Sequence, residues 1–225
     1  ALSINIDFKK SHILGVPASH LDEMVFHQDA SFLKDAPFMS TLVQNPNHIG
    51  CHTMGSSESF FKGTHEIERD VIDICAVDIL KGNSGGFDGY VASGGTEANL
   101  QAVWIYKNYY KEKFGAQLNE IKIICSEDTH YSCAKAANVF EIGLTRIPVN
   151  NENRLVDENE LEKIISNEVS QGTKYFIVIV NMMTTMFGSV DSVAAYSKAL
   201  DQHQLEYKIH VDGAFGGFYY PFTGD

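Results

Sequence analysis

The run YFIVIVN, from Tyr175 to Asn181, constrains the fold more than any other stretch of the sequence. It is apolar on both of the faces that alternate along a β-strand, so both faces need a hydrophobic cover. Strands of this kind lie inside parallel sheets that carry helices on both sides. The rest of the chain must therefore supply further strands and the helices that cover them.

Helical and extended patterns alternate along the chain from Thr64 onward. Thr64 is expected to open the first helix, Asp157 and Glu160 stand at capping-box spacing, and Gly143 is expected to close another helix. The predicted helices cover 64–77, 96–113, 131–143, 157–170 and 193–204. The predicted strands are a run that ends at Ser93, then 121–125, 144–149, 175–181 and a strand with a turn over 208–217.

This alternation predicts an α/β fold in which a mostly parallel sheet is flanked by helices. Its length of 225 residues, with 44% hydrophobic residues, is enough for one large domain. Ligands of such folds bind beyond the carboxyl ends of the strands. Polar residues that directly follow strands are therefore the candidates for function.

Charge and composition exclude several classes of partner. Lys and Arg number 17 against 29 Asp and Glu, so the formal net charge is −12 and no basic stripe is available for nucleic acid. No apolar run approaches the roughly 18 residues of a membrane span, and the first residues do not resemble a secretion signal. The four cysteines form no CxxC pair. We expect a cytoplasmic protein with reduced thiols and no membrane partner.

The stretch GYVASGGTEANLQAVW contains the first strand end, at Ser93 to Thr96. Glycines let a backbone approach a ligand closely, and the free N–H groups at a helix start attract phosphate. The motif lacks the Lys-Ser/Thr pair of a nucleotide P-loop and the spacing of GxGxxG. Residues 94–96 are therefore a candidate anion site, and the alternative is that Ser93 or Thr96 only caps the helix.

Three more strand ends carry polar residues: SEDTHYS supplies His130, VNMMTTMFGSVD supplies Thr184 and Thr185, and HVDGAFGGFYYP supplies Asp212. Each has a simpler interpretation. His130 would be a surface or hydrogen-bonded core histidine, the threonines would stabilise a turn, and Asp212 would cap a helix or pair with a lysine. A buried carboxylate needs a partner, so a cation is expected near Asp212.

One ligand fits these strand ends together, because pyridoxal phosphate offers a phosphate for 94–96, a flat ring for His130 to cover and a protonated ring nitrogen for Asp212. In this order, the motifs SGGTEANL, DTHYSCAK, TTMFGSVD and HVDGAFGGF resemble the signatures of the group II pyridoxal-phosphate-dependent amino-acid decarboxylases. The resemblance covers about residues 48–225. It implies the aspartate-aminotransferase (type I) fold, with a mostly parallel seven-stranded sheet flanked by helices.

The resemblance also assigns roles to single residues. Gly95 and Thr96 match the family's phosphate-binding pair, and Gly94 lies beside them in the same loop. By the same resemblance, the cofactor is pyridoxal 5'-phosphate and the substrate is an L-amino acid, which loses carbon dioxide.

The ring of the cofactor has its own set of matching residues. His130 matches the histidine that stacks on the ring, and Ala214 matches the small residue packed against it. Thr184 matches the threonine near the ring substituents, although Met183 stands where the family usually has glycine. Asp212 matches the aspartate that pairs with the ring nitrogen and keeps it protonated. His130 and Asp212 are thus the predicted catalytic residues.

The family's Schiff-base lysine, usually preceded by histidine, has no match in this sequence. No His-Lys pair occurs, and neither Lys135 nor Lys208 stands in a suitable position. The sequence is therefore expected to be the N-terminal part of a longer enzyme, with its C-terminal part missing. The predicted boundaries are an N-terminal arm over 1–55 and an incomplete large cofactor-binding domain over 56–225.

The arm contains NPNHIGCHT, which resembles the extended segment that reaches the active site near the family's dimer interface. A homodimer with composite active sites is therefore expected. His48 and His52 have a metal-ligand spacing for a helix, but Pro46 and Gly50 argue against a helix there, so no metal is expected.

Two alternatives stay open beside the decarboxylase. One is another lyase of the same fold, similar to sphingosine-phosphate lyase, which shares motifs of the SGGTE and HVDA type. The other is a catalytically silent fragment that keeps the fold without the lysine. The sequence does not distinguish among amino-acid substrates.

Overall fold

The computed structural model describes residues 62–224. The chain divides into two compact units, the first ending at Val91 and the second starting at Ala92. The domain boundary predicted between residues 55 and 56 lies outside the described residues, as do Cys51, His48 and His52. The division into an arm and a large domain therefore stays a prediction.

The described part of the first unit is a helix and the loop that follows it. Helix α3 (Lys62–Asp73) includes two residues before the predicted start at Thr64 and continues as the π-helical turn Ile74–Ile79. The predicted strand ending at Ser93 is wrong. Residues 87–92 pair with no strand among those described, and the Val91 N–H donates instead to the Glu68 carboxylate, 2.7 Å away. A strand forms only where a neighbouring backbone completes its ladder.

The second unit is built on a four-stranded parallel sheet, as the alternation predicts. Its strands are β1 (Ile121–Ser126), β2 (Gly143–Ile147), β3 (Tyr175–Asn181) and β4 (Glu206–Asp212), in the spatial order β2-β1-β3-β4. The described residues thus contain four strands of the expected seven-stranded sheet. YFIVIVN forms a central strand with neighbours on both sides.

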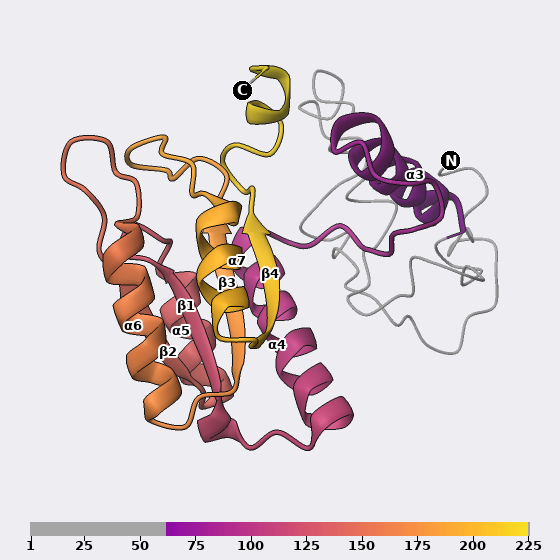
Figure 1. The fold of residues 1–225 in the computed structure, drawn as a ribbon. Coiled ribbons are helices and arrows are strands. Elements are labelled where there is room, and N and C mark those ends of the chain that lie inside the picture. Colours follow the sequence, from indigo (N-terminus) through magenta and orange to yellow (C-terminus); the bar gives the residue numbers. More distant parts are fainter. Residues whose placement is uncertain (1–61, 225) are drawn as a thin grey trace, which may run out of the picture. The chain divides into compact units, whose positions relative to one another are not determined.

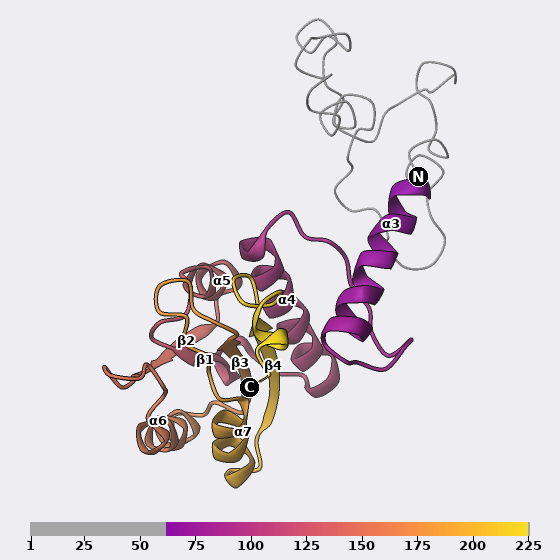
Figure 2. The ribbon, with the colours of Figure 1, turned by 90° about the horizontal axis from the view of Figure 1, so that it is seen from above.

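Helices cover both faces of this sheet (Figures 1 and 2). Helices α4 (Gly95–Phe114) and α5 (Ser132–Phe140) lie on one face, and α6 (Glu158–Ser170) and α7 (Val193–Gln202) lie on the other. Strand β3 supplies side chains to both layers, with Ile177 and Ile179 on the α4–α5 side and Phe176 and Val178 on the α6–α7 side. This three-layer arrangement explains why its sequence is apolar throughout.

Two thiols lie in the α4–α5 layer of the core. Cys125 of β1 and Cys133 of α5 are buried and free. Burial raises the pKa of Cys125 to about 11 and that of Cys133 to about 12. Both thiols therefore act as small buried apolar groups, as expected, whereas Cys75 is half-buried. None of the helices described within residues 62–224 has the length and apolar composition of a membrane span.

The ends of the helices partly follow the sequence signals. Asp157 caps α6 by accepting hydrogen bonds from the N–H groups of Asn159 and Glu160, as predicted. The prediction that Gly143 closes α5 is wrong, because α5 ends at Phe140 and Glu141 takes the left-handed conformation at φ 56°. Gly143 is instead the first residue of β2. Helix α5 is therefore shorter than expected, because Glu141 adopts the left-handed conformation that ends it.

Glu168 of α6 connects this helix to two strands. Its buried carboxylate contacts Lys122 Nζ of β1 at 2.8 Å and accepts a hydrogen bond of 2.6 Å from the Thr145 hydroxyl of β2. Burial alone raises the pKa of this carboxyl, but the contacts with Lys122 and Thr145 outweigh burial and lower it below its ordinary value of 4.5. The ionised carboxylate therefore stabilises the folded state.

Replacing Glu168 with glutamine is expected to lower the free energy of unfolding by about 1–3 kcal/mol at neutral pH. Because the folded pKa is depressed, this contribution is present above the ordinary pKa and is lost as the pH falls through the lowered value. Urea unfolding at neutral pH and near pH 3 would measure it. Glu160→Gln, which removes an exposed carboxylate paired with Lys163, is the control. Equal effects of the two substitutions would contradict the prediction.

The topology places a crevice beyond β1 and β3. From β1 the chain moves outward to β2, then returns across β1 to β3 and continues to β4. The direction therefore reverses between the adjacent strands β1 and β3, and ligands of open α/β sheets bind at the carboxyl ends of such a pair. His130 follows β1 and Thr184 follows β3.

Candidate active site

A cavity of about 530 Å³ opens at the carboxyl ends of the strands. Its volume is in the range of small-molecule and cofactor sites. Six of the seven residues predicted to bind the cofactor line this cavity: Gly95, Thr96, His130, Thr184, Asp212 and Ala214. The seventh, Gly94, directly precedes Gly95 in the sequence. The fold thus brings together groups that lie far apart in the sequence.

The start of α4 forms one wall of the cavity. Its N-cap residue is Gly94, and no side chain among the described residues caps it. The simpler interpretation, in which Ser93 or Thr96 caps this helix, is therefore wrong. The Ser93 N–H donates to the Glu97 carboxylate at 2.6 Å. The first N–H groups of a helix lack acceptors within the helix, so the start of α4 offers donors and a positive dipole end to an anion.

Gly95 approaches Ala214 closely at this wall. A Cβ built on Gly95 would lie 2.9 Å from the Ala214 Cβ, closer than carbon atoms pack. Gly94 differs, since a Cβ there would meet no atom within 4 Å and its φ of 168° is ordinary extended backbone. The second glycine of the pair is thus required by packing, and the first is not.

Asp212 ends β4 and lies half-buried beside the cavity. Its Oδ1 accepts the Ala214 N–H at 3.1 Å, and its Oδ2 accepts a hydrogen bond of 2.8 Å from the Asn99 amide of α4. Both described partners of this carboxylate are neutral. The simpler interpretation, in which Asp212 pairs with a lysine, is therefore wrong among the described residues, and the carboxylate lines the cavity without a cationic partner from them.

His130 is exposed at the cavity, and its Nδ1 is held by contacts with Ser132. Its Nδ1 lies 2.8 Å from the Ser132 hydroxyl and accepts the Ser132 backbone N–H at 3.3 Å. Because a backbone N–H can only donate, this contact favours the tautomer of a neutral imidazole that carries its proton on Nε2. The Tyr131 ring lies beside the imidazole, with 4.1 Å between the centroids.

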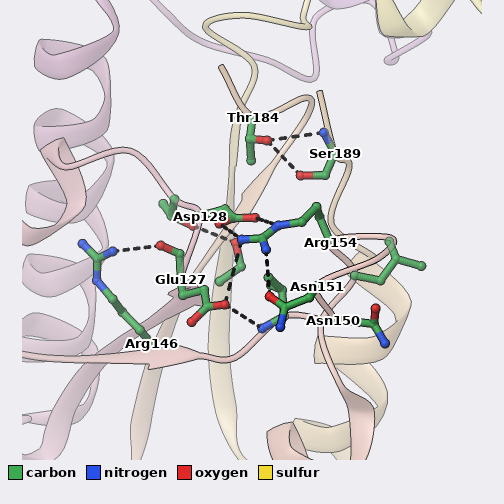
Figure 3. Close-up of polar contacts among 12 residues, drawn as sticks. Glu127, Asp128, Arg146, Asn150, Asn151, Arg154, Thr184 and Ser189 are labelled. Carbon is green, nitrogen blue, oxygen red and sulfur yellow. Dashed lines mark hydrogen bonds and ion pairs between the residues drawn. The ribbon is translucent and has the colours of Figure 1, made fainter. Parts of the chain in front are cut away.

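Thr184 lines the cavity but uses its hydroxyl locally. Its Oγ1 lies 2.8 Å from the Ser189 hydroxyl and accepts the Ser189 N–H at 3.3 Å (Figure 3). The Thr184 N–H also donates to the Ser189 carbonyl. These contacts fit the interpretation in which the threonine stabilises a turn. Its contact with a cofactor ring stays a prediction.

Met183, which stands where the resembling family has glycine, adopts the left-handed conformation at φ 67°. This region costs a residue with a side chain about 1 kcal/mol, and glycine little. Met183→Gly is therefore expected to be more stable than Met183→Ala by about 1 kcal/mol, the reverse of the usual order. Both variants lose the Met183 side chain beyond Cβ. The difference between their urea unfolding midpoints therefore reports the cost of the left-handed backbone conformation. An alanine variant equal to or better than the glycine variant would refute this.

A buried polar network reaches the cavity through Asn181 and Thr129, which line it. The Asn181 amide at the end of β3 donates to the Asp191 carboxylate at 2.6 Å, the Thr129 hydroxyl at 2.8 Å and the Ser126 hydroxyl at 3.1 Å. The Asn181 N–H also donates to Asp191 at 2.8 Å. Burial raises the pKa of the Asp191 carboxyl, although these hydrogen bonds oppose the rise. The network ties the ends of β1 and β3 to the loop that carries Thr184.

Arg154 joins two loops that contribute residues to the cavity lining, and Figure 3 shows its pairing with Asp128. Its guanidinium pairs with the Asp128 carboxylate, with Nε 2.9 Å from Oδ2, and lies 4.3 Å from the centre of the Phe187 ring. Asp128 follows β1, and Phe187 belongs to the loop after β3. This cation therefore holds the two loops beside each other.

Several residues at the cavity were not predicted from the sequence. Asn99 stands one helical turn after Gly95, and Asn181 ends the most apolar strand, so helical spacing and strand position were available signals. Arg154 had no signal, because its partner Asp128 is far from it in sequence. Among the described residues that line the cavity, none is a lysine.

Comparison with known proteins agrees with the geometry. Residues 65–224 match the pyridoxal-dependent decarboxylase conserved domain. The chain is 49% identical over 221 residues to the tryptophan decarboxylase of Clostridium sporogenes, covering 98% of this chain and 53% of that protein. It is 32% identical over 168 residues to the L-tyrosine/L-aspartate decarboxylase of Methanocaldococcus jannaschii, covering 73% and 40%.

A solved structure shows the same fold. The L-methionine decarboxylase of Streptomyces sp. 590 superposes with a TM-score of 0.64 at 22% identity, over 76% of this chain and 47% of that one. The chain thus spans about half the length of the curated relatives named here. Three findings agree: the matched domain, the identity to named decarboxylases and the shared type I fold. The chain therefore belongs to the pyridoxal-dependent decarboxylase family.

Proposed function

We propose that the complete protein decarboxylates an L-amino acid to the corresponding amine and carbon dioxide, with pyridoxal 5'-phosphate as cofactor. The observation that carries the proposal is one cavity that contains both an uncapped helix start and a carboxylate with neutral partners, Asp212. The first suits a phosphate, and the second suits a protonated ring nitrogen.

The residues of the cavity fit this cofactor. The N–H groups at Gly95 and Thr96 would bind its phosphate, and the Asp212 carboxylate would bind the protonated ring nitrogen. His130 and Ala214 would contact the ring. When bound, pyridoxal phosphate supplies an electron sink for the bond that breaks.

The protein groups hold charges and exclude water. Asp212 keeps a proton on the ring nitrogen, since a fixed negative charge favours the protonated form. His130 offers its Nε2–H as a donor at the cavity, where it can orient a substrate carboxylate. Arg154 keeps the loops after β1 and β3 together, which limits access of water to the ring.

We further propose that the substrate is an aromatic L-amino acid, with tryptophan as the leading candidate. This is supported by the 49% identity to a tryptophan decarboxylase. It is also supported by exposed apolar side chains of the cavity lining, Tyr131, Met186 and Phe215, which can pack on an aromatic ring. The relatives compared here are named decarboxylases, so this activity is favoured over another lyase of the same fold.

The proposal includes a cytoplasmic homodimer with composite active sites. The resemblance to a family of dimers supports the assembly. Free, buried Cys125 and Cys133 suit a reducing compartment.

Borohydride reduction of the complete protein with pyridoxal phosphate, followed by intact-mass measurement, tests the cofactor. One pyridoxyl-phosphate mass on a lysine is expected. A panel of L-amino acids, tryptophan included, is then assayed for released carbon dioxide and amine. A complete protein that stays unmodified and releases no carbon dioxide would favour the catalytically silent alternative.

A further inference from the structure

Asn99 is a buried amide of α4 that joins the two predicted catalytic residues, and only 2% of it is exposed. Its Nδ2 donates to Asp212 Oδ2 at 2.8 Å and to the Ser132 hydroxyl at 2.9 Å. The same hydroxyl lies 2.8 Å from His130 Nδ1. The Asn99 amide thus connects two groups: the Asp212 carboxylate, proposed to bind the ring nitrogen, and, through Ser132, the His130 imidazole, proposed to contact the ring face.

His210 completes the set of hydrogen bonds around this amide. Its Nε2 lies 2.7 Å from Asn99 Oδ1. His210 stands two positions before Asp212 on β4, so both side chains lie on the face of the strand that α4 covers. Burial lowers the pKa of His210, which keeps the ring neutral. The amide is therefore held from its oxygen side by a neutral donor.

The donors and acceptors of this network have only one consistent arrangement. An ionised carboxylate can only accept, so the Asn99 NH₂ group must face Asp212 and its oxygen must face His210. The His210 proton is then on Nε2. Ser132 accepts from Asn99 and is free to donate to His130 Nδ1, which already accepts a backbone N–H. The proton of His130 is accordingly held on Nε2, on the cavity side.

We propose that Asn99 is a positioning residue of the cofactor site. It fixes the Asp212 carboxylate for the ring nitrogen and, through Ser132, holds His130 as the Nε2–H tautomer. This inference rests on the proposed function, because it assumes that pyridoxal phosphate occupies the cavity. The competing explanation is that Asn99 only satisfies buried polar groups and supports the packing of α4 on β4.

Two ligands separate these explanations in the complete protein. Pyridoxal phosphate has the ring nitrogen, whereas 1-deazapyridoxal phosphate has carbon in its place and keeps the aldehyde and the phosphate. A residue that acts through Asp212 affects the first ligand selectively. The equilibrium dissociation constant of each ligand would be measured by absorbance titration for the wild type and for Asn99→Leu, which is similar in size but has no hydrogen-bonding group.

The dissociation constant of pyridoxal phosphate is expected to rise about tenfold in Asn99→Leu, the effect of one lost hydrogen bond to a charged group. That of the deaza analogue should stay within about twofold, since it never bonded to Asp212. Asn99→Ala gives the same comparison if the leucine variant does not fold. Tyr106→Phe is the matched control, because it removes a 3.0 Å hydrogen bond between α4 and the Ile209 carbonyl of β4 without touching Asp212.

Each outcome decides the proposal. Selective loss of pyridoxal phosphate affinity in the Asn99 variants, with no selectivity in Tyr106→Phe, supports it. Equal loss of both ligands, or no loss, overturns it and leaves Asn99 a structural residue. A wild-type protein that does not bind pyridoxal phosphate at all would instead refute the proposed function, so the two failures are distinguishable.

Discussion

Replacing Asp212 with alanine is expected to lower kcat of the complete enzyme about 10³-fold while leaving part of the cofactor binding. In the proposed site, the substitution would remove the negative charge that would keep the ring nitrogen protonated, so the electron sink would become shallow. The phosphate contacts proposed for the start of α4 would not involve this side chain, so part of the binding should persist. Steady-state turnover at saturating cofactor and a cofactor titration measure the two effects separately.

Two further variants make this result specific. Asp212→Asn keeps the shape and the acceptor for the Ala214 N–H but not the charge, so it should lose turnover almost as strongly. Asp201→Ala removes an exposed carboxylate of α7, whose described partner is the Tyr207 hydroxyl, and should leave turnover unchanged. Unchanged turnover in Asp212→Ala would sink the assignment of Asp212.

The sequence predicted the elements whose signal is local. The strand YFIVIVN and the cap at Asp157 were placed correctly because apolar alternation and capping depend on neighbouring residues. The prediction of a strand ending at Ser93 was wrong for the opposite reason, because a strand needs a pairing partner that can be distant in the sequence. The predicted end of α5 was wrong because Glu141, and not a glycine, adopts the left-handed conformation that follows the helix.

The candidate site divides in the same way. His130, Thr184 and Asp212 were predicted because each follows an apolar strand, and parallel strands bring their carboxyl ends to one edge. The hydrogen bond between Asn99 and Asp212, and the pairing of Arg154 with Asp128, join residues that no periodic pattern relates. Local patterns therefore locate groups that line the cavity, whereas the contacts that orient those groups depend on the packed structure.

Gly95→Ala is expected to destabilise the protein by about 1–3 kcal/mol and to weaken cofactor binding at least about tenfold. The new Cβ would lie 2.9 Å from the Ala214 Cβ, and both atoms are fixed to the backbone, so the start of α4 must move away from β4. That movement displaces the N–H groups proposed for the phosphate. Thermal or urea unfolding and a cofactor titration of the complete protein would measure both effects.

The cause can be isolated by restoring the space on the opposite side. Ala214→Gly removes the atom that Gly95→Ala would strike, so the double variant should recover most of the lost stability and cofactor affinity, beyond the sum of the two single effects. Gly94→Ala is the matched control, because its Cβ would meet no atom within 4 Å. If Gly94→Ala and Gly95→Ala behaved alike, the helix start would be sensitive to any side chain, and close packing against Ala214 would not be the reason for glycine.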